Sequence, residues 1–310
     1  MSQRHIRAAY ARLDATHLFD GLFVPTKGRK RGRLLVPQRP FGGALIGFQG
    51  FEQLGSSDQS ILLALTAQLG IDGLVIDAAP QGEISQQLRL DLKFSQDGGM
   101  PLASKETSLR SLLIDAGYEE PDSGPSLKQA KECLNRLANA QLREQNLNTG
   151  WDQRYNLISV RFDVGLGDKI HVAANPRLSQ AVFAGQHVRI SLIERAAMKT
   201  QVAKILHCWL CSNVRLGQAL GRGNGARIDT LAPHVWGAEG WEVASRSMKS
   251  RYRAQLRDAL DEIRDATKRL GGSYEWAIDR TSDLVMVSRP KMLPIAEFFE
   301  LLPSDMAMRK

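Results

Sequence analysis

The chain has 310 residues and a formal net charge of +8, with 41 lysines and arginines against 33 aspartates and glutamates. Its length allows two domains of ordinary size, and its basic balance favours an anionic partner, nucleic acid before a membrane surface. No apolar run of about 18 residues and no apolar segment near the start is present, so we expect a cytoplasmic protein without a transmembrane helix or a signal peptide.

Residues 1–40 are predicted to form a flexible basic arm around one short helix that carries Arg4, Arg7 and Arg12. A denser basic run follows, and its five cations are assigned to DNA: Lys27, Arg29, Lys30, Arg31 and Arg33. Such a run typically binds phosphates without reading the base sequence. The alternative is a solvated tail with no partner.

Residues 41–170 are predicted to form a first winged-helix domain. The expected elements are a strand (44–50), a helix (57–69), two strands (73–94), a second helix (102–117), a third helix (125–140), and a hairpin with a further strand (141–176). The third helix has an apolar arc, and the neighbouring arc carries three candidate DNA-binding residues: Lys128, Lys131 and Asn135.

Residues 171–295 are predicted to form a second winged-helix domain, followed by a tail over 296–310. A helix over 199–213 precedes a short helix over 227–237, a turn of about seven residues and a long helix over 244–270. Gly271 and Gly272 then end the helix, and two strands follow within 273–290. Helices followed by a hairpin are the order of a winged helix.

The first half of the long helix is almost purely cationic, which suits a recognition helix that lies in a major groove. Six of its residues are assigned to DNA contact: Arg246, Lys249, Arg251, Tyr252, Arg253 and Arg257. For Tyr252, core packing is an equal alternative. For the helix as a whole, the alternative is a solvated surface with ordinary i,i+4 ion pairs.

The two predicted recognition helices begin similarly, with the tripeptides 126–128 (SLK) and 247–249 (SMK), and each follows a short helix that ends in glycine, Gly117 or Gly237. The pattern indicates an internal repeat. We therefore predict an α+β fold class, with two tandem winged-helix domains that divide near residue 170.

No motif indicates catalysis, a cofactor or a metal. Cys208 and Cys211 form a CxxC on a predicted helix without a second pair, so core cysteines are favoured over a zinc or redox site. The glycine-rich segment 221–227 lacks the Gly-Lys-Ser/Thr that cradles a nucleotide phosphate. The histidines form no His-x-His pair. The three cysteines are too few for a disulfide framework.

Several segments together resemble the RepC family, the iteron-binding replication initiators of IncQ-type plasmids. They are NPRLSQAVFAGQHVRISLIERAA, IDTLAPHVWG, SMKSRYRAQLRDALDEI, SLRSLLIDAGY and SGPSLKQAKECLNRL. The resemblance covers residues 45–290. It implies two winged-helix domains, binding to directly repeated iterons, opening of an AT-rich segment, and recruitment of a plasmid helicase and primase. It also implies exchange between a homodimer and a DNA-binding monomer, and it supplies no catalytic residues.

Two other functions remain open on the sequence. A transcriptional repressor on the same scaffold would usually carry one DNA-reading domain and a separate effector or dimer domain. An enzyme acting on DNA is disfavoured by the missing metal and nucleotide motifs. Two basic recognition helices favour the initiator, because one monomer can contact major-groove faces about one turn apart.

Overall fold

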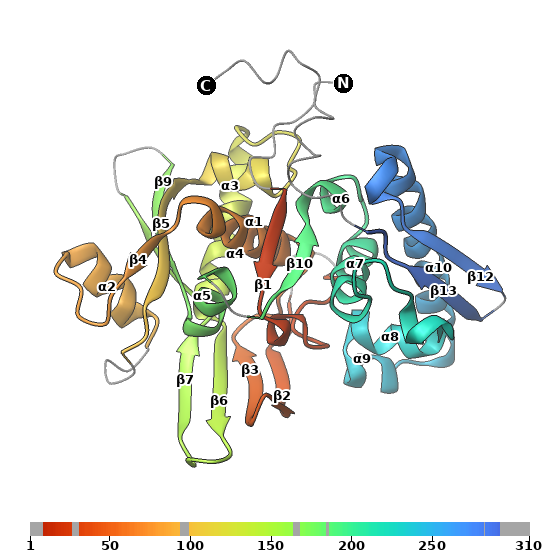
Figure 1. Cartoon of the computed structure of the whole chain (residues 1–310), viewed down its shortest axis with the longest axis horizontal. Helices are drawn as coiled ribbons and strands as arrows, with labels where there is room; N and C mark the ends of the chain where they lie inside the picture. Colours follow the sequence, from red (N-terminus) through yellow and green to blue (C-terminus); the bar gives the residue numbers. More distant parts are fainter. Residues whose placement is uncertain are drawn as a thin grey trace.

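The computed structural model describes residues 9–26, 31–93, 99–163, 168–183, 186–281 and 283–291, and this part of the chain is a mixed α+β structure (Figure 1). The helices are α1 (Ser56–Asp72), α2 (Glu83–Asp91), α3 (Leu109–Asp115), α4 (Gly124–Asn139), α5 (Pro176–Phe183), α6 (Leu192–Ala196), α7 (Gln201–Asn213), α8 (Ile228–Trp236), α9 (Ala238–Glu242) and α10 (Arg246–Leu270). Short 3-10 helices cover Ala15–Leu18, Leu220–Gly223 and Gly272–Tyr274. None of the helices in these residues has both the length and the apolar character needed to cross a bilayer.

The strands form four antiparallel sheets within the described residues. They are β1 (Tyr10–Leu13), β2 (Leu34–Phe41), β3 (Ala44–Gly50), β4 (Leu74–Ile76), β5 (Leu102–Ser108), β6 (Gln141–Asn146), β7 (Asp152–Asn156), β8 (Ile158–Phe162), β9 (Lys169–Ala174), β10 (Val188–Ser191), β11 (Ala226–Arg227), β12 (Ala277–Thr281) and β13 (Leu284–Ser288).

The two halves of the chain share one order of elements: helix, strand, helix, helix, strand, strand. In the first half these elements are α1, β5, α3, α4, β8 and β9, and in the second half they are α7, β11, α8, α10, β12 and β13. The sheet orders also correspond, because the last strand lies between the other two in both β5-β9-β8 and β11-β13-β12. The first half adds β4 and α2 between α1 and β5, and β6 and β7 between α4 and β8. The second half adds α9 between α8 and α10.

A further sheet, in the order β2-β3-β6-β7, combines β2 and β3, which precede α1 in the chain, with β6 and β7, which lie between α4 and β8. It carries two hairpins away from the helices (Figure 1). In β3 the side chains of Ala44, Ile46 and Phe48 are buried, as the two-residue period of a strand requires. The second strand of the hairpin predicted within 141–176, over residues 154–162, is in fact two strands. β7 pairs with β6, the chain changes sheets at the buried Leu157, and β8 pairs with β9.

The halves share one hydrophobic core. Helix α1 runs through it, and every side chain from Ile61 to Leu65 is fully buried. β1, from the start of the chain, pairs with β10 of the second half, with Tyr10 opposite Ser191. Helix α5 packs against α1 and β5 of the first half.

The prediction of a flexible arm over residues 1–40 does not hold where the structure describes this segment. Residues 10–13 and 34–41 are the strands β1 and β2, and Ala11 and Leu13 are fully buried. Local sequence does not indicate this pairing, because the partner of β1, strand β10, lies far along the chain. Residues 1–8 and 27–30, and the predicted tail over 296–310, lie outside the described residues.

Two further elements differ from their prediction. Of the two strands predicted within 73–94, only β4 forms, and the other is helix α2, in which Ile84 and Leu88 lie one turn apart. The helix predicted over 102–117 is strand β5 followed by helix α3. Ser108 divides them, because its side chain accepts the Ser111 N–H and caps α3. The helices predicted over 199–213 and 244–270 are confirmed as α7 and α10.

Candidate nucleic-acid interface

Helix α10 presents a cationic face in the second half. Ser245 caps its first turn by accepting the Met248 N–H at 3.3 Å. The apolar side packs on α7 and α8 through Leu256, Leu260 and Ile263, all fully buried. The predicted cations therefore lie on the outer side of the helix, with Arg246 and Arg251 exposed.

Two of these cations are already paired with carboxylates. Arg253 donates from Nε and Nη2 to the two oxygens of Asp229, at 2.6 and 2.8 Å. The hydrogen bonds from Arg253 are the main reason why the pKa of Asp229 lies below its ordinary value. Arg257 donates to Asp283 at 3.0 Å, in the turn between β12 and β13. Within the described residues, Arg246 and Arg251 have no ion-pair partner.

Aromatic rings lie beneath the start of α10. Tyr252 stacks on Trp236, with ring centroids 4.1 Å apart, so its ring is engaged in packing. The segment predicted as a turn contains α9, whose Trp241 ring has Lys249 Nζ at 5.2 Å and the Arg253 guanidinium carbon at 5.6 Å. Both distances suit cation–π contacts, which hold the two cations over one ring. Sequence reasoning missed Asp229 and Trp241, since neither belongs to the basic pattern.

Helix α4 presents the corresponding face in the first half. Its capping residue is Ser123, and the apolar arc predicted for it is buried through Ala130, Leu134 and Leu137. The three residues assigned to DNA, Lys128, Lys131 and Asn135, are all exposed. A surface groove runs along this face, and its lining includes Lys128 and Asn135 together with Phe51, whose side chain is 84% exposed.

The residues of the basic run after residue 26 have different surroundings in the structure. Arg31 is not available to DNA, because its side chain is only 13% exposed and donates to the fully buried Asp58 at 2.6 Å. Arg136 of α4 donates to the other oxygen of Asp58 at 2.8 Å. Arg33 is exposed just before β2. Lys27, Arg29 and Lys30 lie outside the described residues.

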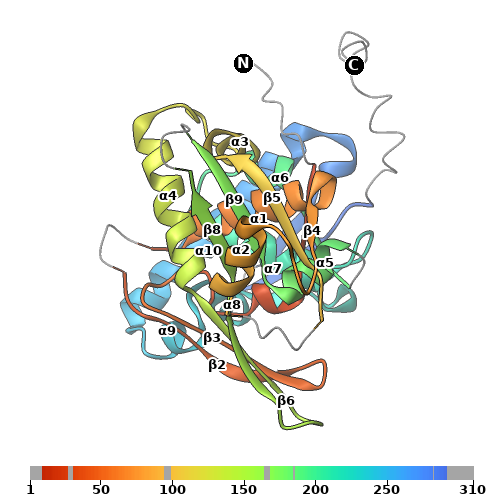
Figure 2. The ribbon, with the colours of Figure 1, turned by 90° about the vertical axis from the view of Figure 1, so that its left-hand side faces the viewer.

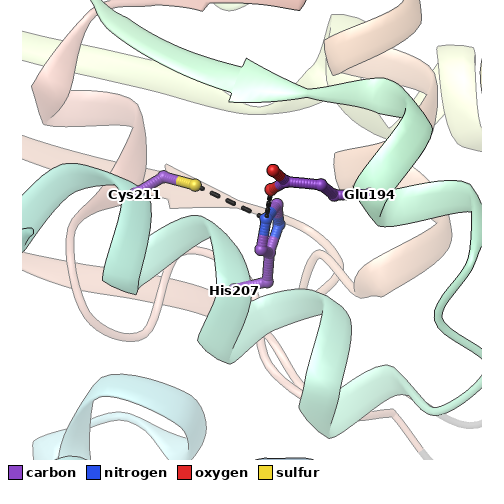
Figure 3. Close-up of side chains that lie close together, drawn as sticks. All are labelled: Glu194, His207 and Cys211. Atoms are coloured by element: carbon purple, nitrogen blue, oxygen red, sulfur yellow. Dashed lines mark hydrogen bonds and ion pairs between the residues drawn. The ribbon is translucent and has the colours of Figure 1, made fainter. Parts of the chain in front are cut away.

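A buried polar cluster lies under the second half (Figure 3). Glu194 of α6 is 2.6 Å from His207 Nε2, and Cys211 Sγ is 3.6 Å from the same nitrogen. The Trp276 indole N–H donates to Glu194 at 3.2 Å. Burial by itself lowers the pKa of His207, but Cys211, Cys208 and the hydrogen bond with Glu194 outweigh it. The resulting pKa lies well above the ordinary value.

Glutamate, histidine and cysteine can all bind zinc, and the ligand atoms of these three lie within 4.8 Å of one another. Two ligands at about 2.0 Å from one tetrahedral zinc are about 3.3 Å apart. The 2.6 Å between Glu194 and His207 is a hydrogen-bond distance instead, and Trp276 occupies the same carboxylate. The cluster is therefore arranged as a hydrogen-bonded part of the core, and the prediction that Cys208 and Cys211 are buried in the core is confirmed.

Comparison with known proteins identifies the family. The model of the replication protein C (RepC) family matches residues 4–278. No curated protein matches the chain. A crystal structure of SeMet derivatives of domains 2 and 3 of RctB is similar at a TM-score of 0.49 and 11% identity, over 89% of this chain and 98% of that one. Another structure of RctB domains 2–3 has a TM-score of 0.48 and 11% identity, over 86% and 95%. The family match covers most of the sequence. The chain belongs to the RepC replication protein C family.

Proposed function

We propose that the chain initiates plasmid replication by binding directly repeated iterons at an origin through two winged-helix domains. The two matching halves are the domains, and α4 and α10 are their recognition helices. One observation carries the proposal: both halves place an exposed cationic helix at the same position in the same order of elements. Membership of a replication-protein family supports it further.

The boundary between the domains is proposed after α5 instead of near residue 170. Helix α5 packs against α1 and β5, which belong to the first half. Ser179 of α5 also accepts the N–H of Ala103 in β5 at 2.9 Å. A first domain that ends at Phe183 keeps these contacts within one unit.

The cations of α10 are proposed to divide into two roles. Arg246, Lys249 and Arg251 bind backbone phosphates, because they lie on the first half of the helix and have no carboxylate partner among the residues that the structure describes. Arg253 is oriented by Asp229 and contacts a base edge, for which guanine is the usual partner of arginine. Lys128, Lys131 and Asn135 make the weaker contacts in the first domain.

Residues around the basic run are proposed to add phosphate contacts alone. Arg33 is exposed beside β2, and Lys27, Arg29 and Lys30 stay assigned to the DNA backbone as a prediction from sequence. Tyr252 is proposed to support the helix through Trp236 instead of touching a base.

The proposed mechanism draws its free energy from binding. Several protomers on adjacent iterons favour bent or untwisted DNA, which promotes opening of an AT-rich segment. The opened strands then receive the plasmid helicase and primase. The sequence contains no phosphate-cradling Gly-Lys-Ser/Thr loop, so a DNA-binding role is favoured over an enzymatic one. Exchange between a homodimer and a DNA-binding monomer is part of the same proposal.

Footprinting on the origin of the source plasmid tests the proposal. An initiator of this kind protects a series of direct repeats, and sedimentation shows one protomer bound per repeat. Protection of a single palindrome by a dimer would instead indicate the repressor. Equal affinity for origin and random duplexes would show that the chain does not bind DNA in a sequence-specific way.

A further inference from the structure

Arg195 is buried where the two halves meet, and it bonds to both of them. It lies on α6 and is 2% exposed. Toward the first half it donates to Ser56 O at 3.1 Å and to Ser60 Oγ at 3.2 Å, both on α1. Toward the second half it donates to Lys204 O at 2.7 Å and to Cys208 Sγ at 3.0 Å, both on α7.

The geometry of these acceptors is specific for a guanidinium. On each helix the two acceptors are four residues apart, so they lie one above the other on one face. A planar fork with donors on both sides can hold two such pairs at once, whereas a lysine ammonium cannot span them. Arg195 therefore fixes α1 against α7 both along and across their axes.

A second contact between the halves lies near the surface. Asp20 is 2.8 Å from Nδ1 of His234 in α8, and its own backbone carbonyl accepts a hydrogen bond from Arg39 of β2 at 3.0 Å. Gly21 and Gly237 approach closely beside it, since a Cβ on Gly237 would lie 3.3 Å from the Gly21 Cα. Both glycines have positive φ, so the chain can make this approach without strain.

The two helices that Arg195 connects pack against the two helices whose exposed faces are proposed to bind DNA. Helix α1 packs against α4, and α7 packs against α10. Figure 2 shows α4 and the helix α9, which precedes α10, on the same side of the molecule. Fixing α1 against α7 therefore fixes the separation and the relative rotation of α4 and α10.

We propose that Arg195, assisted by Asp20, is a positioning residue that sets the spacing between the two DNA contacts that one protomer makes. This inference rests on the proposed function. The length of the iteron is then determined by the contact between the halves as well as by the recognition helices. A protomer with a loosened contact tolerates repeats whose two contact regions are displaced.

The test compares Arg195→Lys with wild type on duplexes that carry one origin repeat, either intact or with five base pairs inserted between the two contact regions. Five base pairs are about half a helical turn, which moves the second contact to the opposite face of the DNA. Wild type should lose about 100-fold in affinity through the insertion. Arg195→Lys should bind the intact repeat less tightly and lose about 10-fold or less through the insertion.

Arg89→Lys is the matched control. Arg89 is also 2% exposed, but it donates to the carbonyls of Asp77 and Met100 within the first half. It should lower stability and keep the 100-fold penalty. If Arg195→Lys does not fold, Asp20→Asn is tested in its place. It weakens the second contact between the same two halves, at a partly exposed position. An undiminished penalty in the folded variant would show that the contact is merely structural. Failure of wild type to prefer the intact repeat over random DNA would refute the proposed function instead.

Discussion

Arg253 shows how one carboxylate changes what a cation on a DNA-binding face can do. Asp229 accepts from Nε and Nη2, so it uses one edge of the guanidinium and holds the side chain in place before DNA arrives. An arginine that is already ordered loses less conformational entropy on binding. The pairing also neutralises Asp229, which would otherwise repel phosphates.

We expect Arg253→Ala to cost about 1–3 kcal/mol on the specific repeat and to relax the preference at one base pair. Asp229→Asn should keep part of the affinity and lose part of the preference, because the arginine remains but is less well oriented. Competition binding with single-base variants of the repeat measures both effects. Arg264→Ala, in the far half of the same helix, is the control and should leave binding unchanged. An equal loss on specific and random DNA would make Arg253 a backbone contact.

Glu194 is the acceptor for both His207 and Trp276 in the core. Glu194→Gln should lower the free energy of unfolding by about 2–4 kcal/mol, because a buried ion pair loses one partner. Glu239→Gln, on the exposed surface of α9, should change it by less than about 0.5 kcal/mol. Denaturant unfolding measures both values.

The same cluster predicts a dependence of stability on pH. The pKa of His207 is raised in the folded chain, so its stabilisation is complete below about pH 6.5, the unfolded value, and is lost as the pH rises through the folded pKa. Wild type should therefore lose stability as the pH rises above about 6.5, and His207→Asn should lose less. Parallel curves for the two proteins would contradict this assignment.

At the scale of elements, α4 and α10 pack into their halves in the same way, but a side chain of opposite charge anchors each helix. The buried positions of α4 (Ala130, Cys133, Leu134 and Leu137) have the same spacing as those of α10 (Leu256, Ala259, Leu260 and Ile263). In this correspondence Arg136 matches Glu262, and each binds the start of the first helix of its half. Arg136 binds Asp58 in α1, and Glu262 accepts the Thr200 N–H at 3.0 Å at the cap of α7.

The same correspondence corrects the predicted alignment of the recognition helices. The tripeptides that begin at Ser126 and Ser247 are not equivalent, because Lys128 precedes the first buried position by two residues and Lys249 precedes it by seven. The residues that cap the starts of the two helices are Ser123 for α4 and Ser245 for α10. Helix α10 therefore extends about one turn further at its start than α4, and this extra turn carries Arg246 and Lys249. The glycines at the ends of the preceding helices do correspond, since Gly117 and Gly237 both have φ of +78°.

We expect Arg136→Ala to destabilise the fold more than Glu262→Ala, by about 2 against about 1 kcal/mol. Asp58 is fully buried, and without Arg136 one of its oxygens loses its charged partner, although Arg31 keeps the other. Glu262 binds a partly exposed helix end, where water can replace it. Denaturant unfolding of the two variants measures the difference, with Glu132→Ala on the exposed face of α4 as control. The reverse order would show that the cap of α7 matters more than the buried pair.

At the scale of the whole molecule, opening an origin costs duplex stacking of about 1.4 kcal/mol for each base-pair step. Binding energy from several protomers must supply this cost. We therefore expect the purified protein to open the AT-rich segment of supercoiled plasmid that carries the iterons, equally with and without ATP. Permanganate reactivity of unpaired thymines is the measurement, and relaxed DNA without iterons is the control. Strand cleavage or ATP turnover above background would place the protein among enzymes.

The sequence by itself determined the features that depend on neighbours along the chain. Periodic apolar positions located α4, α7 and α10, because a helix puts residues three and four apart on one side. Lys128, Lys131, Arg246 and Arg251, which the pattern placed away from the apolar sides of α4 and α10, are exposed. Glycines that adopt positive φ marked the helix ends at Gly117 and Gly237.

Only the tertiary structure decided which charges stay available and how the halves are joined. Arg31 lies in a basic run, yet it is bound to Asp58, and Arg253 and Arg195 likewise have partners on other helices. β1 pairs with β10, far along the chain, and packs against α1. The strength of these contacts depends on distance and burial, which local sequence does not encode, so a basic pattern alone cannot distinguish a cation that meets DNA from one that holds the core together.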